Sequence, residues 1–376
     1  MKRSFSLTVI LSVIVTIASA QGTGYIFTQK KDLACTPVKN QASTNTCWCF
    51  SGISLFESEL LRMGKPAVDL SEMFIVRHTY EKKAGMYARM HGNSTFAGGG
   101  EYGDLLTGTA ERGLVPESTY PGMNYGEIKH NHNELDAVLK GYMEPLAKSS
   151  RLTTAWRNGF NGILDAYLGK MPQTFTYEGK NYTPTAYAKE LGINPDDYVI
   201  FTSFTHHPFY KQFALEVPDN WAAGLFWNLP VEDMMQIIDN ALANGYTVAW
   251  ASDMSDKGFS MKEGVAIVPE KSWNEMTPEE SAMAFASPQK ERKITQEMRQ
   301  AEFDNYSTTD DHGMHIVGLA TDQTGTTFYK VKNSWGITGK YDGFIYVSRP
   351  YIMLRTTNCM VNRNGIPAEI RKKMGI

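Results

Sequence analysis

The chain has 376 residues, of which 42% are hydrophobic, and a formal net charge of -3 at pH 7. This length is sufficient for a two-lobed enzyme with substantial hydrophobic cores. The small net charge gives no general attraction to nucleic acid or to an anionic membrane, so we expect neither as a partner.

The N-terminus has the three parts of a secretory signal peptide. Met1-Lys2-Arg3 is followed by an apolar run from Leu7 to Ile17 and then by Ala18-Ser19-Ala20. The apolar run is too short to span a bilayer, so we expect no membrane span. We predict cleavage after Ala20, which leaves residues 21–376 as the mature chain of an exported, soluble protein, periplasmic or secreted.

A polar stretch from Gln41 leads into a cysteine at the start of a predicted helix. In the first turn, unpaired backbone N–H groups and the helix dipole favour a thiolate at Cys47. The side-chain amide of Gln41 and the Cys47 N–H can together bind an oxyanion. A random cysteine is more often a small buried apolar residue. This stretch alone therefore does not decide whether Cys47 is a nucleophile. The helix is indicated by apolar residues at helical spacing: Cys49, Ile53, Phe56, Leu60 and Met63.

The middle of the chain contains a glycine run and a long helical region. Gly98, Gly99 and Gly100 expose backbone to which an extended peptide substrate can hydrogen-bond, although such a run alone indicates a flexible loop. The region from Glu134 to Leu168 is predicted to be helical, with apolar residues at core spacing.

Two histidine pairs are candidate metal ligands. His130 and His132 form one pair, and His206 and His207 form the other. Neither pair has carboxylate or thiol neighbours in the sequence, so we predict no metal and no cofactor.

The C-terminal half is predicted to be rich in strands after a helix over Val231–Ala243. His312 begins an apolar strand, Thr327–Val331 forms a second strand, and the turn-rich link between them predicts a hairpin that brings His312 close to Asn333. An imidazole can take a proton from a thiol and return it to a leaving amine. Asn333 can orient the ring, and Trp335 can cover that hydrogen bond.

The order of these residues resembles the papain-like cysteine peptidases. The resemblance implies that Cys47 is the nucleophile, His312 the general base, Asn333 its orienting partner and Gln41 part of the oxyanion hole. A family glycine six positions after the histidine matches Gly318 and selects His312 over His315, which we expect to pack in or beside the sheet.

Within that superfamily the chain is most similar to the bleomycin hydrolase and aminopeptidase C subfamily. The similarity covers roughly residues 32–367 and rests on five segments. The subfamily's glycine pair at the cleft matches Gly99 and Gly100, which we predict, with Trp335, to be substrate-binding residues. The five segments are 99–102, 113–116, 172–178, 182–187 and 249–253.

The resemblance implies an α+β, papain-like fold with two lobes in a single domain over residues 21–376. A helical lobe carries the cysteine (about 25–120), a helical insertion follows (about 121–200), and an antiparallel β-rich lobe carries the histidine and asparagine (about 201–350). Residues 351–376 form a C-terminal segment.

The cysteines other than Cys47 are Cys35, Cys49 and Cys359. Three thiols cannot all pair, and Cys49 belongs to the helix core by its spacing. The expectation is no structural disulfide.

The resemblance implies a cysteine peptidase that cleaves peptide substrates through an acyl-thioester, most consistent with an aminopeptidase of bleomycin hydrolase type. Relatives place a C-terminal arm in the cleft to bind the free amine of the substrate, whereas here only Ala368–Ile376 follows Pro367. An endopeptidase, or an acyl transferase or amidase with the same triad, therefore stays open. An inactive peptide-binding scaffold is disfavoured. A homo-oligomer, a hexamer in relatives, is implied by resemblance only.

Overall fold

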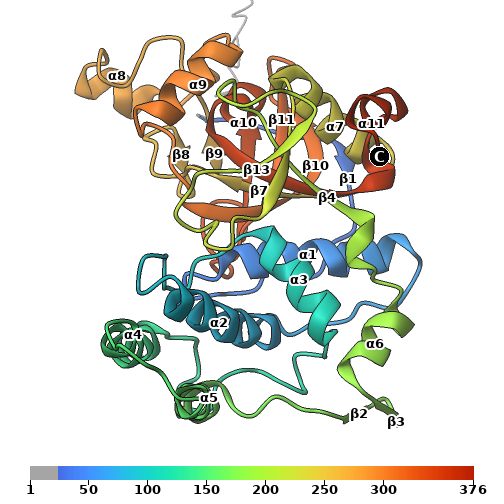
Figure 1. Cartoon of the computed structure of the whole chain (residues 1–376). Coiled ribbons are helices and arrows are strands. Elements are labelled where there is room, and N and C mark those ends of the chain that lie inside the picture. Colours follow the sequence, from blue (N-terminus) through green and yellow to red (C-terminus); the bar gives the residue numbers. More distant parts are fainter. Residues whose placement is uncertain (1–23) are drawn as a thin grey trace, which may run out of the picture.

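The computed structural model describes residues 24–376, so the expected signal peptide over residues 1–20 lies outside the described residues. Helices form the lower lobe in Figure 1 and a large sheet forms the upper one. None of the helices in residues 24–376 is both long and apolar enough to cross a membrane.

The lower lobe is built from the first half of the chain. It contains α1 (Cys47–Arg62), α2 (Glu72–Arg89), α3 (Tyr102–Arg112), α4 (Asn133–Ala147), α5 (Ala155–Leu168), the hairpin β2 (Phe175–Tyr177) with β3 (Lys180–Tyr182), and α6 (Pro184–Leu191).

The upper lobe is built around the sheet. Its strands are β1 (Thr28–Asp32), β4 (Tyr198–Thr202), β5 (Lys211–Ala214), β6 (Leu225–Asn228), β7 (Val248–Ser252), β8 (Phe259–Ser260), β9 (Val265–Ala266), β10 (His312–Thr321), β11 (Thr327–Lys332), β12 (Phe344–Ser348) and β13 (Thr356–Asn362). Its helices are α7 (Val231–Ala243), α8 (Pro278–Met283), α9 (Gln296–Asp304), α10 (Arg349–Arg355) and α11 (Ala368–Met374), with short 3-10 turns at η1 (Pro195–Asp197) and η2 (Arg363–Gly365).

The strand order is β5-β6-β4-β13-β7-β10-β11-β12-β9-β8, with β1 added to β10. The pairs are antiparallel except β4 with β6 and β9 with β12. The predicted α+β class with an antiparallel β-rich lobe is confirmed. The segment 351–376 supplies β13 in the middle of the sheet and α11, which packs on α7 at the flank marked C in Figure 1.

The predicted hairpin that carries the histidine and the asparagine is present as β10 and β11. Thr321 pairs with Thr327, and His315 pairs with Lys332. The Asp322 side chain closes the turn by accepting from the backbone N–H groups of Thr324 at 2.8 Å and Thr326 at 2.9 Å. A short polar side chain that satisfies the turn backbone explains why this link reverses the chain.

The long helix predicted from Glu134 to Leu168 is wrong in one respect, because the chain forms two helices. α4 ends at Ala147 and α5 begins at Ala155. The link contains serines and threonines, whose hydroxyls compete for backbone hydrogen bonds. Ser149 Oγ donates to the Pro145 carbonyl at 3.2 Å, which helps to end α4.

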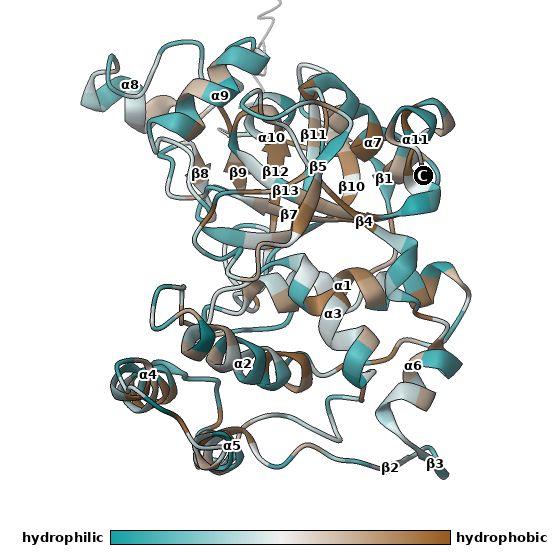
Figure 2. Ribbon diagram, viewed as in Figure 1, coloured by the Kyte–Doolittle hydropathy of each residue, from teal (hydrophilic) through white to brown (hydrophobic). Residues whose placement is uncertain are grey.

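Two buried clusters lie on opposite faces of the sheet. Trp250, Ile316 and Val331 pack against the apolar face of α7, and Figure 2 shows α7 and β10 as largely hydrophobic ribbon. The other cluster joins α1, α2 and α3 to the sheet through residues such as Ala249 and Met360. The helical lobe is therefore fixed to the sheet by a continuous core.

One charged side chain is completely buried in the upper lobe without a carboxylate partner. The Arg299 guanidinium donates to the carbonyls of Ser203 at 2.7 Å and Met353 at 3.0 Å, and also to the Thr356 carbonyl. It lies 4.6 Å from the centre of the Phe204 ring. Burial lowers the pKa of Arg299 to about 9. This arginine therefore joins α9 to α10, to β13 and to the residue after β4 through backbone acceptors.

Replacing Arg299 by methionine should destabilise the protein by about 3 kcal/mol or more, because several buried carbonyls lose their donor. Urea denaturation followed by tryptophan fluorescence measures the loss. Arg292→Met is the matched control, since Arg292 forms only a partly exposed pair at 4.0 Å from Glu302 and should cost little. Equal stability of the two variants would contradict this account.

Candidate functional site

The beginnings of α1 and β10 meet at the cysteine. Cys47 is the first residue of α1, and His312 is the first residue of β10. Gly313 lies directly on α1, where a Cβ atom would stand 2.8 Å from Ser51 Oγ and 3.1 Å from the Cys47 carbonyl oxygen. Only a residue without a side chain allows this approach. Sequence analysis missed Gly313, whose signal was its place directly after the predicted base.

The imidazole of His312 is held by two residues that follow β11. Its Nε2 atom lies 2.7 Å from Asn333 Oδ1. Asn333 Oδ1 also accepts from the Ser334 backbone N–H at 2.7 Å, which fixes this atom as the oxygen of the amide. Nε2 therefore carries the proton, and Nδ1 is the free acceptor. The Trp335 ring packs on the imidazole at 4.7 Å between centres.

The Gln41 side chain is also oriented from the loop after β11. Its Oε1 atom accepts from Ser334 Oγ at 2.6 Å, and its backbone N–H donates to the Ser334 carbonyl at 2.8 Å. Its Nε2 donors have no partner within residues 24–376. An amide whose oxygen is already bonded and whose N–H groups are free is suited to bind an anion.

Burial disfavours the charged forms of both Cys47 and His312. It raises the pKa of the Cys47 thiol to about 12, although hydrogen bonding from the backbone N–H groups of Gly313 and Trp48 lowers that pKa. Burial also lowers the pKa of His312 to about 4, although its bond to Asn333 raises it. The start of the helix was expected to lower the pKa of Cys47, but desolvation outweighs this effect.

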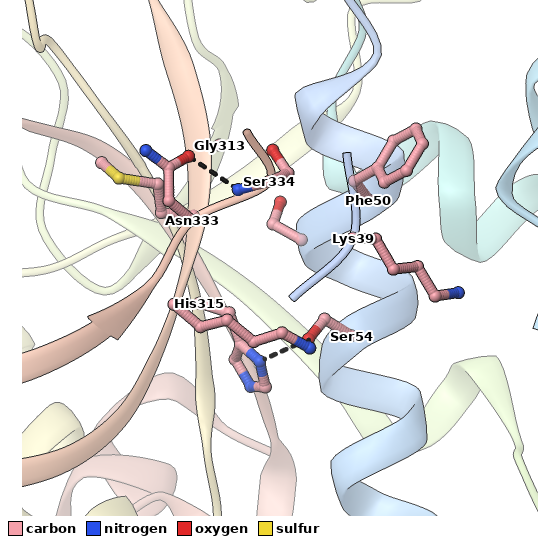
Figure 3. Close-up of a pocket in the computed structure, with 10 residues that line it drawn as sticks. Lys39, Phe50, Ser54, Gly313, His315, Asn333 and Ser334 are labelled. Atoms are coloured by element: carbon pink, nitrogen blue, oxygen red, sulfur yellow. Dashed lines mark hydrogen bonds between the residues drawn. The ribbon is translucent and has the colours of Figure 1, made fainter. Parts of the chain in front are cut away.

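His315 lies in the packed interface between β10 and α1, as expected. It is 1% exposed, and its Nδ1 atom lies 2.9 Å from Ser54 Oγ. Figure 3 shows this pair together with Asn333 and Ser334. All four residues line a void of about 10 Å³. The void is of the size of one water molecule.

Residues 75–375 match the peptidase C1-like family. The chain is 23% identical to aminopeptidase C of Lactobacillus delbrueckii subsp. lactis over 89% of this chain and 81% of that protein. It is 21% identical to bleomycin hydrolase of Rattus norvegicus over 96% and 88% of the two chains. The crystal structure of PepW from Lactobacillus rhamnosis superposes with a TM-score of 0.73 at 18% identity, covering 93% of this chain and 84% of that one.

The chain belongs to the peptidase C1-like family. The predicted resemblance to aminopeptidase C and bleomycin hydrolase is confirmed, as are the papain-like fold and the assignment to the cysteine-type peptidases. All four cysteines of this C1-like peptidase are free thiols, with Cys49 and Cys359 buried.

The glycines expected to line the cleft are covered by other parts of this C1-like peptidase. A side chain on Gly99 would collide with the Asp219 carboxylate, and one on Gly100 would meet the Trp48 ring at 2.9 Å. The carbonyl of Gly99 already accepts from Lys83. The absence of side chains here permits close packing within the chain.

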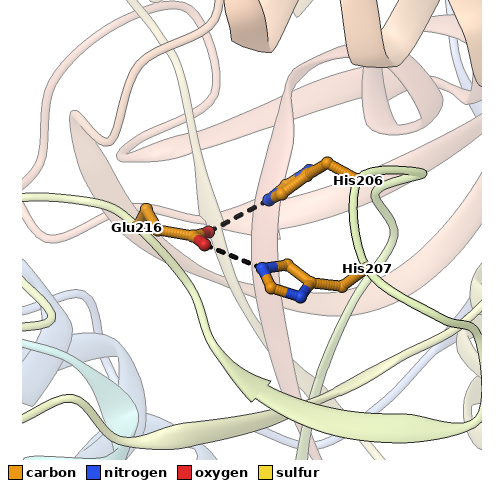
Figure 4. Close-up of side chains that lie close together, drawn as sticks. All are labelled: His206, His207 and Glu216. Atoms are coloured by element: carbon orange, nitrogen blue, oxygen red, sulfur yellow. Dashed lines mark hydrogen bonds and ion pairs between the residues drawn. The ribbon is translucent and has the colours of Figure 1, made fainter.

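His206 and His207 have a carboxylate neighbour in the folded chain, so the expectation from the sequence that they have none is wrong. Glu216 Oε2 lies 3.0 Å from His206 Nε2, and Glu216 Oε1 lies 2.7 Å from His207 Nε2 (Figure 4). Sequence analysis missed this contact because His207 and Glu216 are nine positions apart, with β5 between them. Both imidazoles hydrogen-bond to the Glu216 carboxylate, which fixes one end of the loop between β5 and β6.

Replacing His312 by glutamine should slow the alkylation of Cys47 by iodoacetamide at pH 7 by about 100-fold or more, because the raised pKa then leaves almost no thiolate. In the unchanged enzyme the rate should fall as the pH drops through about 4, where His312 becomes protonated and cannot accept the proton. Mass spectrometry of the labelled peptide measures both rates.

His315→Gln is the matched control, since it removes a buried imidazole from the same strand. It should leave the alkylation rate of Cys47 unchanged. If His312→Gln also keeps the full rate, the helix start alone activates the sulfur.

Proposed function

We propose that this chain is a cysteine aminopeptidase in which Cys47, His312, Asn333 and Gln41 carry the chemistry. The observation that supports it best is the pair of bonds from the loop after β11, one orienting His312 through Asn333 and one orienting Gln41 through Ser334. The names of the relatives, aminopeptidase C and bleomycin hydrolase, support the same activity.

In the proposed reaction the Cys47 sulfur attacks the carbonyl carbon of the scissile bond while His312 Nδ1 takes the thiol proton. Gln41 Nε2 and the Cys47 backbone N–H bind the oxyanion that forms. The C–N bond then breaks as the imidazolium gives its proton to the leaving amine, which leaves an acyl-thioester. Water attacks the thioester with His312 as base, releasing the acid and restoring the thiol.

We also propose where the enzyme is located, that it forms an oligomer, and which residues border its substrate. The residues before Gln21 support export from the cytoplasm, to the periplasm or the medium, and N-terminal sequencing of the purified native protein tests the cleavage. The resemblance supports a homo-oligomer, and light scattering of the purified protein tests it. Trp335 is proposed to border the bound substrate, and Gly99 and Gly100 are proposed to do so through Asp219 and Trp48, which cover them.

Cys47→Ala should abolish peptide hydrolysis, with a loss of roughly a millionfold, because no other group in the site can form the thioester. Release of a fluorescent amine from an aminoacyl amide measures the rate. Cys35→Ala is the matched control, because Cys35 is a free thiol outside the site and its removal should preserve turnover. Substantial turnover by Cys47→Ala would exclude the proposed mechanism.

Asn333→Ala should reduce kcat by about 10- to 100-fold, less than the loss of the general base itself, because the imidazole remains but is free to rotate. The same assay measures kcat with the enzyme saturated. A variant with unchanged kcat would mean that packing on Trp335 alone orients His312.

A further inference from the structure

The loop over residues 215–224 joins β5 to β6 and reaches across to the helical lobe. Trp221 Nε1 donates to Asp104 Oδ2 at 2.9 Å, in the first turn of α3. The Asn220 side chain ties the loop to itself, donating to the Leu215 carbonyl at 2.9 Å and accepting from the Gly224 N–H at 2.8 Å. Together with the bonds of Glu216, these contacts hold the loop firmly over the glycine run.

The loop places one carboxylate, Asp219, directly on Gly99. No hydrogen bond or ion pair reaches this carboxylate from any residue in 24–376. The cation that lowers the pKa of Asp219 is Lys83. Its ammonium group already donates to the carbonyls of Ala97 at 2.6 Å and of Gly99. Asp219 is therefore a partly buried acceptor without a donor of its own.

A second group of unpaired acceptors lies just before the base. Asp310 Oδ2 is buried and has no partner within the described part of the chain. The same holds for Glu101 Oε1, on a residue that is 4% exposed, and for Asn358 Oδ1, on a residue that is 0% exposed. Glu101 Oε2 accepts from Asn358 Nδ2 at 2.9 Å. Buried acceptors without donors are uncommon, and three together indicate that a ligand with several donors completes the site.

The pKa values of the Asp219, Asp310 and Glu101 carboxyl groups are all raised. Burial raises the pKa of Asp219, against the effect of Lys83. Burial and then the charge of Asp219 raise the pKa of Asp310 to about 7, with a smaller increase from Asp311, whereas the neighbouring Glu101 carboxyl and Thr357 hydroxyl lower it. Burial and then Asp310 raise the pKa of Glu101. A bound cation would relieve this repulsion.

Burial, and then the charges of Asp310 and Asp219, raise the pKa of the Cys47 thiol. Beside them lies a cavity of about 440 Å³. Its walls include Val217 and Pro218 from the same loop, and Asp310. Phe303 and Tyr306 add aromatic surface on the other side. The cavity is large enough for an amino-acid side chain, and the carboxylate-bearing residue Asp310 is part of its wall.

We propose that Asp219 and Asp310 bind the protonated α-amine of the peptide substrate and so restrict cleavage to free N-termini. The inference rests on the proposed peptidase activity and names its substrate class. The ammonium group supplies three donors to acceptors that otherwise have none. An acetylated N-terminus brings a carbonyl oxygen and only one N–H to the same carboxylates and is rejected, because the charges stay buried and unpaired.

The test compares leucyl-aminomethylcoumarin with its N-acetylated form. The unchanged enzyme should cleave the free amine at least about 100-fold faster in kcat/KM. Asp219→Asn should lower kcat/KM for the free amine by about 10- to 100-fold, mainly through KM, while hydrolysis of the acetylated form stays the same or rises. Glu178→Gln is the matched control, since Glu178 lies in the exposed turn between β2 and β3 at the far end of the lower lobe (Figure 1).

The outcomes separate the two proposals. Equal cleavage of both substrates by the unchanged enzyme overturns amine recognition but leaves the peptidase standing. An equal loss on both substrates in Asp219→Asn overturns it as well, because it makes Asp219 a structural residue. If neither substrate is cleaved and iodoacetamide leaves Cys47 unlabelled, the proposed function itself fails.

Discussion

The packing of α1 along β10 is the constraint on which the site depends. Ser54, in the middle of α1, accepts from Lys332 Nζ at 2.8 Å and lies 2.9 Å from His315 Nδ1. Lys332 also donates to Thr36 Oγ1 at 3.1 Å. These polar contacts are buried, so a shift of β10 by one residue would leave them unsatisfied and would turn apolar side chains toward Ser54. The register of one helix on one strand thus sets the position of Cys47 relative to His312.

Ser334 links the two halves of the proposed chemistry. Its backbone N–H holds Asn333, and its hydroxyl and carbonyl hold Gln41. The group that orients the base and the group proposed to bind the oxyanion are therefore positioned by one residue. Sequence analysis read this serine only as part of the motif around Asn333. Its role needs the fold, because Gln41 and Ser334 are 293 positions apart.

Features encoded by local pattern were predictable. The helix from Cys47, the helix Val231–Ala243 and the hairpin of β10 and β11 follow from periodicity and turn residues, and each agrees with the structure. The break between α4 and α5 was missed because apolar spacing continues across it. The sequence-based expectation for the helix start also gave too little weight to desolvation, which depends on how much protein surrounds Cys47.

Contacts between distant segments carry no local signal, and most of the unexpected features are of this kind. Glycines 98–100 were recognised, but not that Asp219 would cover Gly99. A glycine run permits close approach of any group, a substrate backbone or a side chain of the same chain. Only the path of the loop after β5 decides between them.

That path bears on the proposed selection of substrates with a free N-terminus. The last described helix, α11, is held on α7, with Lys373 Nζ 3.1 Å from Asp233. The loop over residues 215–224 instead approaches the glycine run from within the sheet lobe, tied down by Glu216 and Trp221. A short loop with both ends fixed loses less conformational entropy on ordering than a free arm of similar length. A carboxylate on such a loop is already in place before the substrate arrives, so the binding free energy of the ammonium group is not reduced by the ordering of its receptor.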